Sequence, residues 1–221
     1  MSDPSRPTRR FEYIDQGEAI YVESFATIRR EVDLSALPAD ADTLAVRMIH
    51  GSGQVDLTAD LVVHPRMVAA SRAALKAGAP ILCDTTMVAT GVSRGRLPRD
   101  NEVRCFLADE RVPALAPAWG TTRAAAAVSL WEPFLGGSVV AIGNAPTALF
   151  HLLELILDGA PRPAAIVGCP VGFIGASESK EALIGFSADC GIDVPYVTVR
   201  GRRGGSAMTS SALNALAQEK E

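Results

Sequence analysis

A histidine stands directly before a Gly-Ser-Gly run at residues 50–53, immediately after the apolar segment 44–49. The unperturbed pKa of histidine lies near neutrality, so the His50 imidazole can donate or accept a proton at working pH. Glycine adopts backbone angles that other residues avoid, so a Gly-Ser-Gly turn can bring the backbone close to a ligand. The pattern predicts an acid/base histidine at the mouth of a pocket. The residues leave one alternative open, a partly buried histidine bonded to a backbone carbonyl.

The other histidines and the four cysteines carry no comparable pattern. His64 precedes Pro65 at a predicted helix start, and His151 lies in the apolar helical run 148–153, so both are interpreted as structural. The cysteines are far apart, with no CxxC pair and no Cys/His cluster, so no metal site is predicted and reduced thiols are expected. The nucleotide patterns GxxxxGK[ST] and GxGxxG between strand and helix, the hydrolase pattern GxSxG and the zinc pattern HExxH are absent.

Short apolar runs rich in β-branched residues alternate with helical patterns along most of the chain. Strands are expected at residues 80–83, 103–106, 139–142, 164–167 and 196–199. Helices are expected at residues 17–32, 65–76, 121–135, 147–157, 177–190 and 206–217. Strands that alternate with helices predict βαβ units and a parallel sheet. The predicted fold class is therefore α/β, a three-layer, flavodoxin-like, doubly wound sheet of five parallel strands with helices on both faces.

Loops rich in Gly, Asn, Ser and Thr follow four of these strands, at residues 84–92, 143–147, 168–180 and 201–206. Such loops before a helix present backbone N–H groups that suit a carboxylate or phosphate. Turns and helix caps require the same residue types, so each loop alone is weak evidence. Arginines also lie in or beside the loops, and guanidinium groups pair bidentately with carboxylates, although most arginines of any protein are simply solvated. Together these features indicate a large, partly apolar anionic ligand.

Length and composition fit one soluble domain. The chain has 221 residues, 48% hydrophobic and 21% charged, which suffices for a single large core. Residues 1–12 are expected to form a flexible N-terminal tail and residues 13–221 a single domain. The net charge of -4 argues against a nucleic-acid partner. No apolar run approaches the roughly 18 residues of a membrane span, so no membrane association and a cytoplasmic location are expected.

Several motifs occur together and in a fixed order. They are Arg47-x-x-His50, Cys83-Asp84-x-x-Met87-Val88-x-x-Gly91-Val92 and the runs 143–149, 168–180 and 201–206. In this order they closely resemble the precorrin-8X methylmutase family of cobalamin (vitamin B12) biosynthesis, over nearly the whole chain from residue 13 to residue 217.

The resemblance implies an isomerase that converts precorrin-8X into hydrogenobyrinic acid by an intramolecular methyl shift, without a metal or redox cofactor. The family's histidine acid, which protonates a ring nitrogen of the substrate, falls on His50. The resemblance places Arg123 near the active site, and Ser24 and Thr86 are weaker candidates for contacts there. It also implies a homodimer with the substrate cleft close to the subunit interface.

The predicted site therefore has one catalytic residue, His50, and several substrate contacts. These contacts are Arg123, Ser24, Thr86, Gly91, Val92, Arg47, Arg202 and Gly204. One histidine acid and a well-positioned substrate suffice for a shift within one molecule. Two alternatives stay open: a non-catalytic tetrapyrrole (corrinoid) carrier in which His50 only donates a hydrogen bond, and a flavodoxin-like module that binds an anion or nucleotide.

Overall fold

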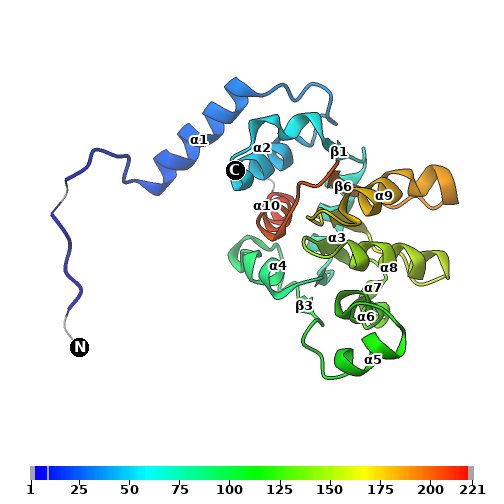
Figure 1. The fold of residues 1–221 in the computed structure, drawn as a ribbon. Helices are drawn as coiled ribbons and strands as arrows, with labels where there is room; N and C mark the ends of the chain where they lie inside the picture. The colour runs from blue at the N-terminus through cyan, green and yellow to red at the C-terminus, as the bar shows by residue number, and fades with distance from the viewer. Residues whose placement is uncertain (1–2, 9, 219–221) are drawn as a thin grey trace.

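A six-stranded sheet forms the centre of the protein, and helices cover both of its faces (Figure 1). The computed structural model describes residues 3–8 and 10–218. The strands are β1 (Leu61–Val63), β2 (Ile81–Cys83), β3 (Val103–Cys105), β4 (Val139–Ile142), β5 (Ala165–Gly168) and β6 (Tyr196–Val199). They lie in the order β1-β6-β5-β4-β2-β3, in which β2 to β6 run parallel and β1 pairs antiparallel with β6.

All five predicted strands form and run parallel, but the sheet has a sixth, antiparallel strand, so the prediction of a five-stranded, wholly parallel sheet is wrong. The missed strand, β1, has only three residues and lies between the 3-10 helix η1 (Val55–Ala59) and Pro65. Its position depends on a distant partner, because Val62 is opposite Thr198 in the register and the His64 N–H bonds the Tyr196 carbonyl at 2.9 Å. A short strand that is held by a partner so far away in the sequence has no local residue pattern from which it could be predicted.

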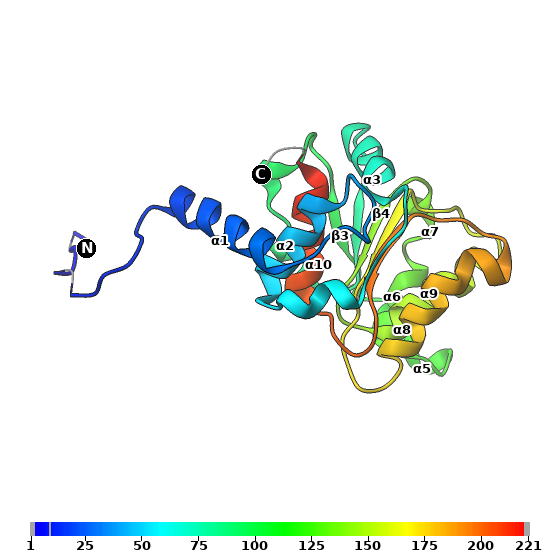
Figure 2. The ribbon, with the colours of Figure 1, turned by 90° about the horizontal axis from the view of Figure 1, so that it is seen from above.

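Alternate residues along the strands belong to two separate cores. Ile81, Val139 and Val167 pack with one set of helices, whereas Leu82 and Val140 pack with the other. This alternation follows from the pleat, which points successive side chains to opposite faces of the sheet. Figure 2 shows the two helical layers on either side of the strands. The doubly covered α/β arrangement is therefore confirmed.

The helices of the first layer carry the residues around His50. They are α1 (Gly17–Glu31), α2 (Asp42–Ser52), α3 (Met67–Lys76), α4 (Thr86–Gly91) and α10 (Ser206–Ala217). Helices α2 and α4 both approach α10 at a glycine, since a Cβ on Gly51 would lie 2.1 Å from Ser211 Oγ and one on Gly91 2.6 Å from Ser210. The predicted turn at residues 51–53 is therefore wrong for Gly51, which is helical, and only Gly53 adopts the left-handed conformation that ends α2.

The helices of the second layer are α5 (Val112–Ala118), α6 (Arg123–Ser129), α7 (Glu132–Leu135), α8 (Pro146–Leu157) and α9 (Ala176–Cys190). The predicted helix at residues 121–135 is interrupted, because α6 ends at Ser129 and α7 begins anew with a proline in its first turn. Helices α4 and α5 were not predicted. No helix within the described residues is long and apolar enough to cross a membrane.

Helix α1 and the segment before it extend away from the rest of the protein (Figure 1; Figure 2). Only Phe25 and Ile28 of α1 are buried, and both belong to the first core. Large apolar side chains elsewhere on this extension are exposed, including Phe11 at 78% and Val22 at 66%. The second half of α1 thus packs into the first core, and Tyr21 in its first half contacts the His50 ring of α2.

The point where the strand order reverses, between β2 and β4, is filled by a carboxylate of the protein itself. Crevices of this kind commonly bind ligands in α/β sheets. Here Asp84, which is 4% exposed, accepts hydrogen bonds from the backbone N–H groups of Gly143, Asn144 and Ala145 at 3.0, 2.9 and 2.9 Å. Burial raises the pKa of Asp84, and the three N–H groups act in the opposite direction. Asp84 therefore ties the β4–α8 loop to the start of α4.

His151 gives the stability of the second layer a predictable pH dependence. Its Nε2 lies 2.7 Å from Ser129 Oγ and joins α8 to α6, and burial lowers the pKa of the ring below 6.5. The unfolded chain therefore takes up this proton first as the pH falls. The contribution of neutral His151 to stability is complete above the unfolded pKa and is lost as the pH falls through the folded one.

Urea unfolding of the wild type and His151→Gln at pH 7.5 and pH 5 tests this dependence. We expect the stability advantage of the wild type to shrink at pH 5, because glutamine can bond Ser129 without titrating. An advantage that is equal at both values, or larger at pH 5, contradicts the expectation.

Candidate active site

His50 lies in the last turn of α2 and is held there by side chains of α1. Its Nδ1 is 2.8 Å from Ser24 Oγ. The rings of Tyr21 and Phe25 lie against the imidazole, with centroids 5.5 and 5.2 Å away. Residues 21, 24 and 25 share one face of a helix, which is why α1 presents all three to the same ring. His50 is exposed and bonds a hydroxyl, so the alternative of a partly buried histidine bonded to a carbonyl is wrong.

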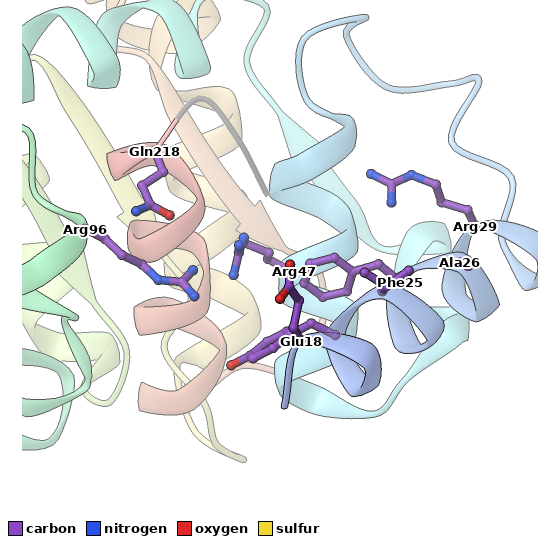
Figure 3. A pocket seen from close by; sticks show the side chains of 9 residues that line it. Glu18, Phe25, Ala26, Arg29, Arg47, Arg96 and Gln218 are labelled. Atoms are coloured by element: carbon purple, nitrogen blue, oxygen red, sulfur yellow. The ribbon is translucent and has the colours of Figure 1, made fainter. Parts of the chain in front are cut away.

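Two cavities adjoin each other beside this histidine. The smaller, about 120 Å³, is lined by Tyr21, Arg47, His50, Ser93, Arg96, Ser211 and Asn214. The larger, about 640 Å³, is shown in Figure 3 and is lined by Glu18, Tyr21, Val22, Phe25, Ala26, Arg29, Arg47, Arg96 and Gln218. Because both are lined by Tyr21, Arg47 and Arg96, the histidine adjoins a continuous hollow that is wide, partly apolar and rich in guanidinium groups.

The floor of the smaller cavity is fixed by Asn214 on α10. Its side-chain amide donates to the Gly91 carbonyl at 2.9 Å and accepts from the Ser93 N–H at 2.8 Å. Gly91 and Val92, both predicted as substrate contacts, form the backbone that Asn214 holds. Val92 itself is buried in the first core, and Gly91 packs on Ser210 of α10. Neither of them lines either cavity, whereas the adjacent Ser93 lines the smaller one.

Arg47, a predicted substrate contact, is confined near the histidine. It is 7% exposed, and its guanidinium lies 5.2 Å from the centroid of the Phe25 ring. It is on the same helix as His50, one turn earlier. The structure thus brings Arg47, Ser24 and His50 together.

Three other predicted contacts lie at the carboxyl edge of the sheet. Thr86 begins α4, with its Oγ1 4.0 Å from Cys105 Sγ. Arg202 lies over the Phe173 ring at 5.1 Å and so links the β6–α10 loop to the β5–α9 loop. Gly204 has a φ of 159°, and a Cβ there would lie 2.3 Å from the Cys169 carbonyl oxygen. Within the described residues these three pack loops together and line neither cavity.

Arg123 lies apart from the histidine. It begins α6 in the second helical layer, and its Nη2 donates to the Leu107 carbonyl at 3.3 Å. The structure does not bring it to either cavity.

Sequence reasoning did not assign Tyr21, Phe25, Arg96 or Asn214 to the site. Tyr21 and Phe25 had a usable signal, an aromatic pair spaced four residues apart around Ser24 on a predicted helix. Arg96 stood among many arginines near loops. Asn214 had no signal, because its two hydrogen bonds depend on the packing of α10 against residues more than a hundred positions away.

Among the described residues, His50 is the candidate for acid/base chemistry, because metal and thiol chemistry find no support. No group of three His, Cys, Asp or Glu side chains there is arranged to hold a metal ion. All four cysteines are free thiols, and burial raises the pKa of Cys169 to about 12 and that of Cys83 further. These buried thiols therefore stay protonated and are poor nucleophiles.

An exposed histidine beside a cavity rich in arginines, on a doubly covered α/β sheet, is the arrangement expected of an enzyme that transfers a proton to or from a large anionic substrate. A family model described as precorrin-8X methylmutase matches residues 19–219, and the chain belongs to that family. The resemblance drawn from the sequence motifs is therefore confirmed.

Individual relatives agree with this assignment. A precorrin-8X methylmutase of Sinorhizobium sp. is 60% identical over 94% of this chain and 97% of its own, and one of Pseudomonas aeruginosa is 59% identical over 95% and 99%. The solved precorrin-8X methylmutase of Thermus thermophilus superposes with a TM-score of 0.80 at 38% identity, over 91% of this chain and 95% of its own. The predicted isomerase class is confirmed, and these names do not favour a non-catalytic carrier.

Proposed function

We propose that the protein converts precorrin-8X into hydrogenobyrinic acid by moving a methyl group to the adjacent ring carbon, with His50 as the general acid. The observation that carries the assignment of the acid is the placement of His50, oriented by Ser24 and facing a hollow lined by Arg47 and Arg96. The relatives named precorrin-8X methylmutase support the substrate.

The geometry supports a specific proton position. As the general acid, His50 is an imidazolium, whose Nδ1–H donates to the Ser24 hydroxyl and whose Nε2–H has no hydrogen bond to any residue that the structure describes. Nε2–H gives its proton to a ring nitrogen of the substrate, which leaves a neutral imidazole with its proton on Nδ1 and draws electrons from the macrocycle. The methyl group then migrates with its bonding pair, and the nitrogen returns its proton to Nε2. The product is an isomer of the substrate, and no atom is gained or lost.

The hollow supplies the other requirements of such a shift. Guanidinium groups suit a macrocycle that carries carboxylates, and the rings of Tyr21 and Phe25 suit its flat apolar face. Positioning contributes much of the rate in an intramolecular reaction, because no second reactant has to be captured.

The degree of identity favours a metal-free substrate. The two relatives near 60% identity are named precorrin-8X methylmutase, whereas one from Priestia megaterium named cobalt-precorrin-8 methylmutase is 34% identical over 91% of this chain and 87% of its own. Incubation of the purified protein with each substrate, followed by absorbance, tests the proposal. We expect the hydrogenobyrinic acid spectrum to appear from precorrin-8X, and slower conversion of the cobalt form. Binding without conversion of either would contradict the isomerase and restore the carrier.

A homodimer is part of the same proposal. The exposed apolar side chains on α1 and the segment before it, such as Phe11 and Val22, support a partner that covers this extension. The same helix lines both cavities, so the partner would lie near the substrate. The cytoplasmic location, the flexible tail 1–12 and the single domain 13–221 stay predictions, as do the contacts assigned to Thr86, Arg123, Arg202 and Gly204.

A further inference from the structure

Arg96 is a half-buried cation with no described partner beside the candidate active site. It ends the 3-10 turn η2 (Arg94–Arg96) between α4 and β3 and lines both cavities. No hydrogen bond or ion pair joins its guanidinium to any residue that the structure describes. In Figure 3 its side chain and that of Arg47 extend toward one another across the hollow.

The charges around this guanidinium do not balance within the described residues. Three arginines and a single acid, Glu18, line the larger cavity. Arg29 is paired with Asp42 at 2.6 Å and Arg47 lies over Phe25, whereas no acid among the described residues pairs with Arg96. Two guanidinium groups directed at one space repel each other unless an anion lies between them.

The turn that carries Arg96 is fixed relative to His50. The Arg96 N–H bonds the Ser93 carbonyl at 2.9 Å, and the Ser93 N–H bonds Asn214 of α10 at 2.8 Å. Helix α2 packs on the same α10 through Gly51, next to His50. One helix therefore sets the positions of both the histidine and the guanidinium.

We propose that Arg96 binds one carboxylate side chain of the macrocycle and thereby fixes which ring nitrogen faces His50. This inference rests on the proposed function for its substrate. A planar guanidinium binds a carboxylate through two parallel hydrogen bonds, which restrict rotation as well as position. Arg96 is a positioning residue, and its loss weakens substrate binding more than the chemical step.

Arg94 provides a matched control on the same turn. It is exposed and lines a different hollow, at the edge of β3 with Glu102 and Arg104. Arg96→Gln and Arg94→Gln remove the same charge from neighbouring positions, so they alter net charge equally and differ only in which hollow they face.

Steady-state kinetics with precorrin-8X and titration with hydrogenobyrinic acid test the proposal in both variants. For Arg96→Gln we expect KM and the product Kd to rise about 10- to 100-fold, kcat to change less than about threefold, and both constants to become less sensitive to salt. Arg96→Lys should recover part of the loss, because it restores the charge without the fork. Arg94→Gln should match the wild type.

Equal KM and Kd for Arg96→Gln and the wild type would overturn the inference, as would equal losses in both variants. Failure of the wild type to convert precorrin-8X would instead overturn the proposed function. Product titration still decides the role of Arg96 in that case, because it needs no turnover.

Discussion

Replacement of His50 by alanine is expected to lower kcat for precorrin-8X by about 10²- to 10⁴-fold, the usual range for loss of a general acid. The side chain is exposed, so its removal leaves no cavity in the core, and the thermal midpoint should stay near that of the wild type. Single-turnover absorbance with excess enzyme measures the chemical step directly. Product titration should show nearly unchanged binding, because the guanidinium groups of the hollow remain.

Ser24→Ala distinguishes proton transfer by the His50 ring from the orientation of that ring by the Ser24 hydroxyl. This variant removes the hydroxyl at 2.8 Å from Nδ1 but leaves the imidazole in place. We expect a loss of about tenfold or less, in line with one hydrogen bond at a partly exposed position. Near wild-type turnover by folded His50→Ala would disprove the acid role. A larger loss in Ser24→Ala than in His50→Ala would show that the hydroxyl, and not the ring, takes part in the reaction.

The sequence pattern singled out His50 among three histidines, and the structure gives the other two packing roles. His64 is 3.0 Å from Asp193 and lies beside the strand pair β1–β6, and His151 joins two helices through Ser129. The local reason offered for His50 was nevertheless partly wrong. Gly51 permits close packing of α2 on α10 and forms no turn. The physical role predicted for Gly51 was therefore wrong, and the acid role of His50 stays a prediction.

The parts of the site that sequence reasoning missed depend on contacts between distant segments. Ser24 was predicted from the family resemblance, and the structure places it 2.8 Å from a ring 26 residues further along the chain. Tyr21 and Phe25 belong to a predicted helix, but a helical pattern does not say which element its apolar face meets. Asn214 and β1 likewise gain their roles from partners far away in the chain. Periodicity and composition predict local structure, whereas tertiary packing decides which distant segments meet at the site.

Buried Asp84 supports the second large prediction, because three backbone N–H groups depend on it. Asp84→Asn is expected to lower the free energy of unfolding by about 2–4 kcal/mol, since the amide nitrogen cannot accept a hydrogen bond and must face at least one of the donors at Gly143, Asn144 and Ala145. The substitution should also destabilise α4 beside the candidate active site. Asp84 immediately precedes Thr85, whose Oγ1 caps α4 by accepting a hydrogen bond from the Met87 N–H.

Urea unfolding at pH 7 measures this change, and Asp40→Asn is the matched control. Asp40 is exposed, and its side chain has no hydrogen bond or ion pair with any residue that the structure describes. The control should leave the unfolding midpoint nearly unchanged. Equal midpoints for Asp84→Asn and Asp40→Asn would mean that the β4–α8 loop finds other acceptors. A deficit confined to Asp84→Asn would show that this carboxylate stabilises the protein through the three backbone N–H groups that it accepts from at the reversal of strand order.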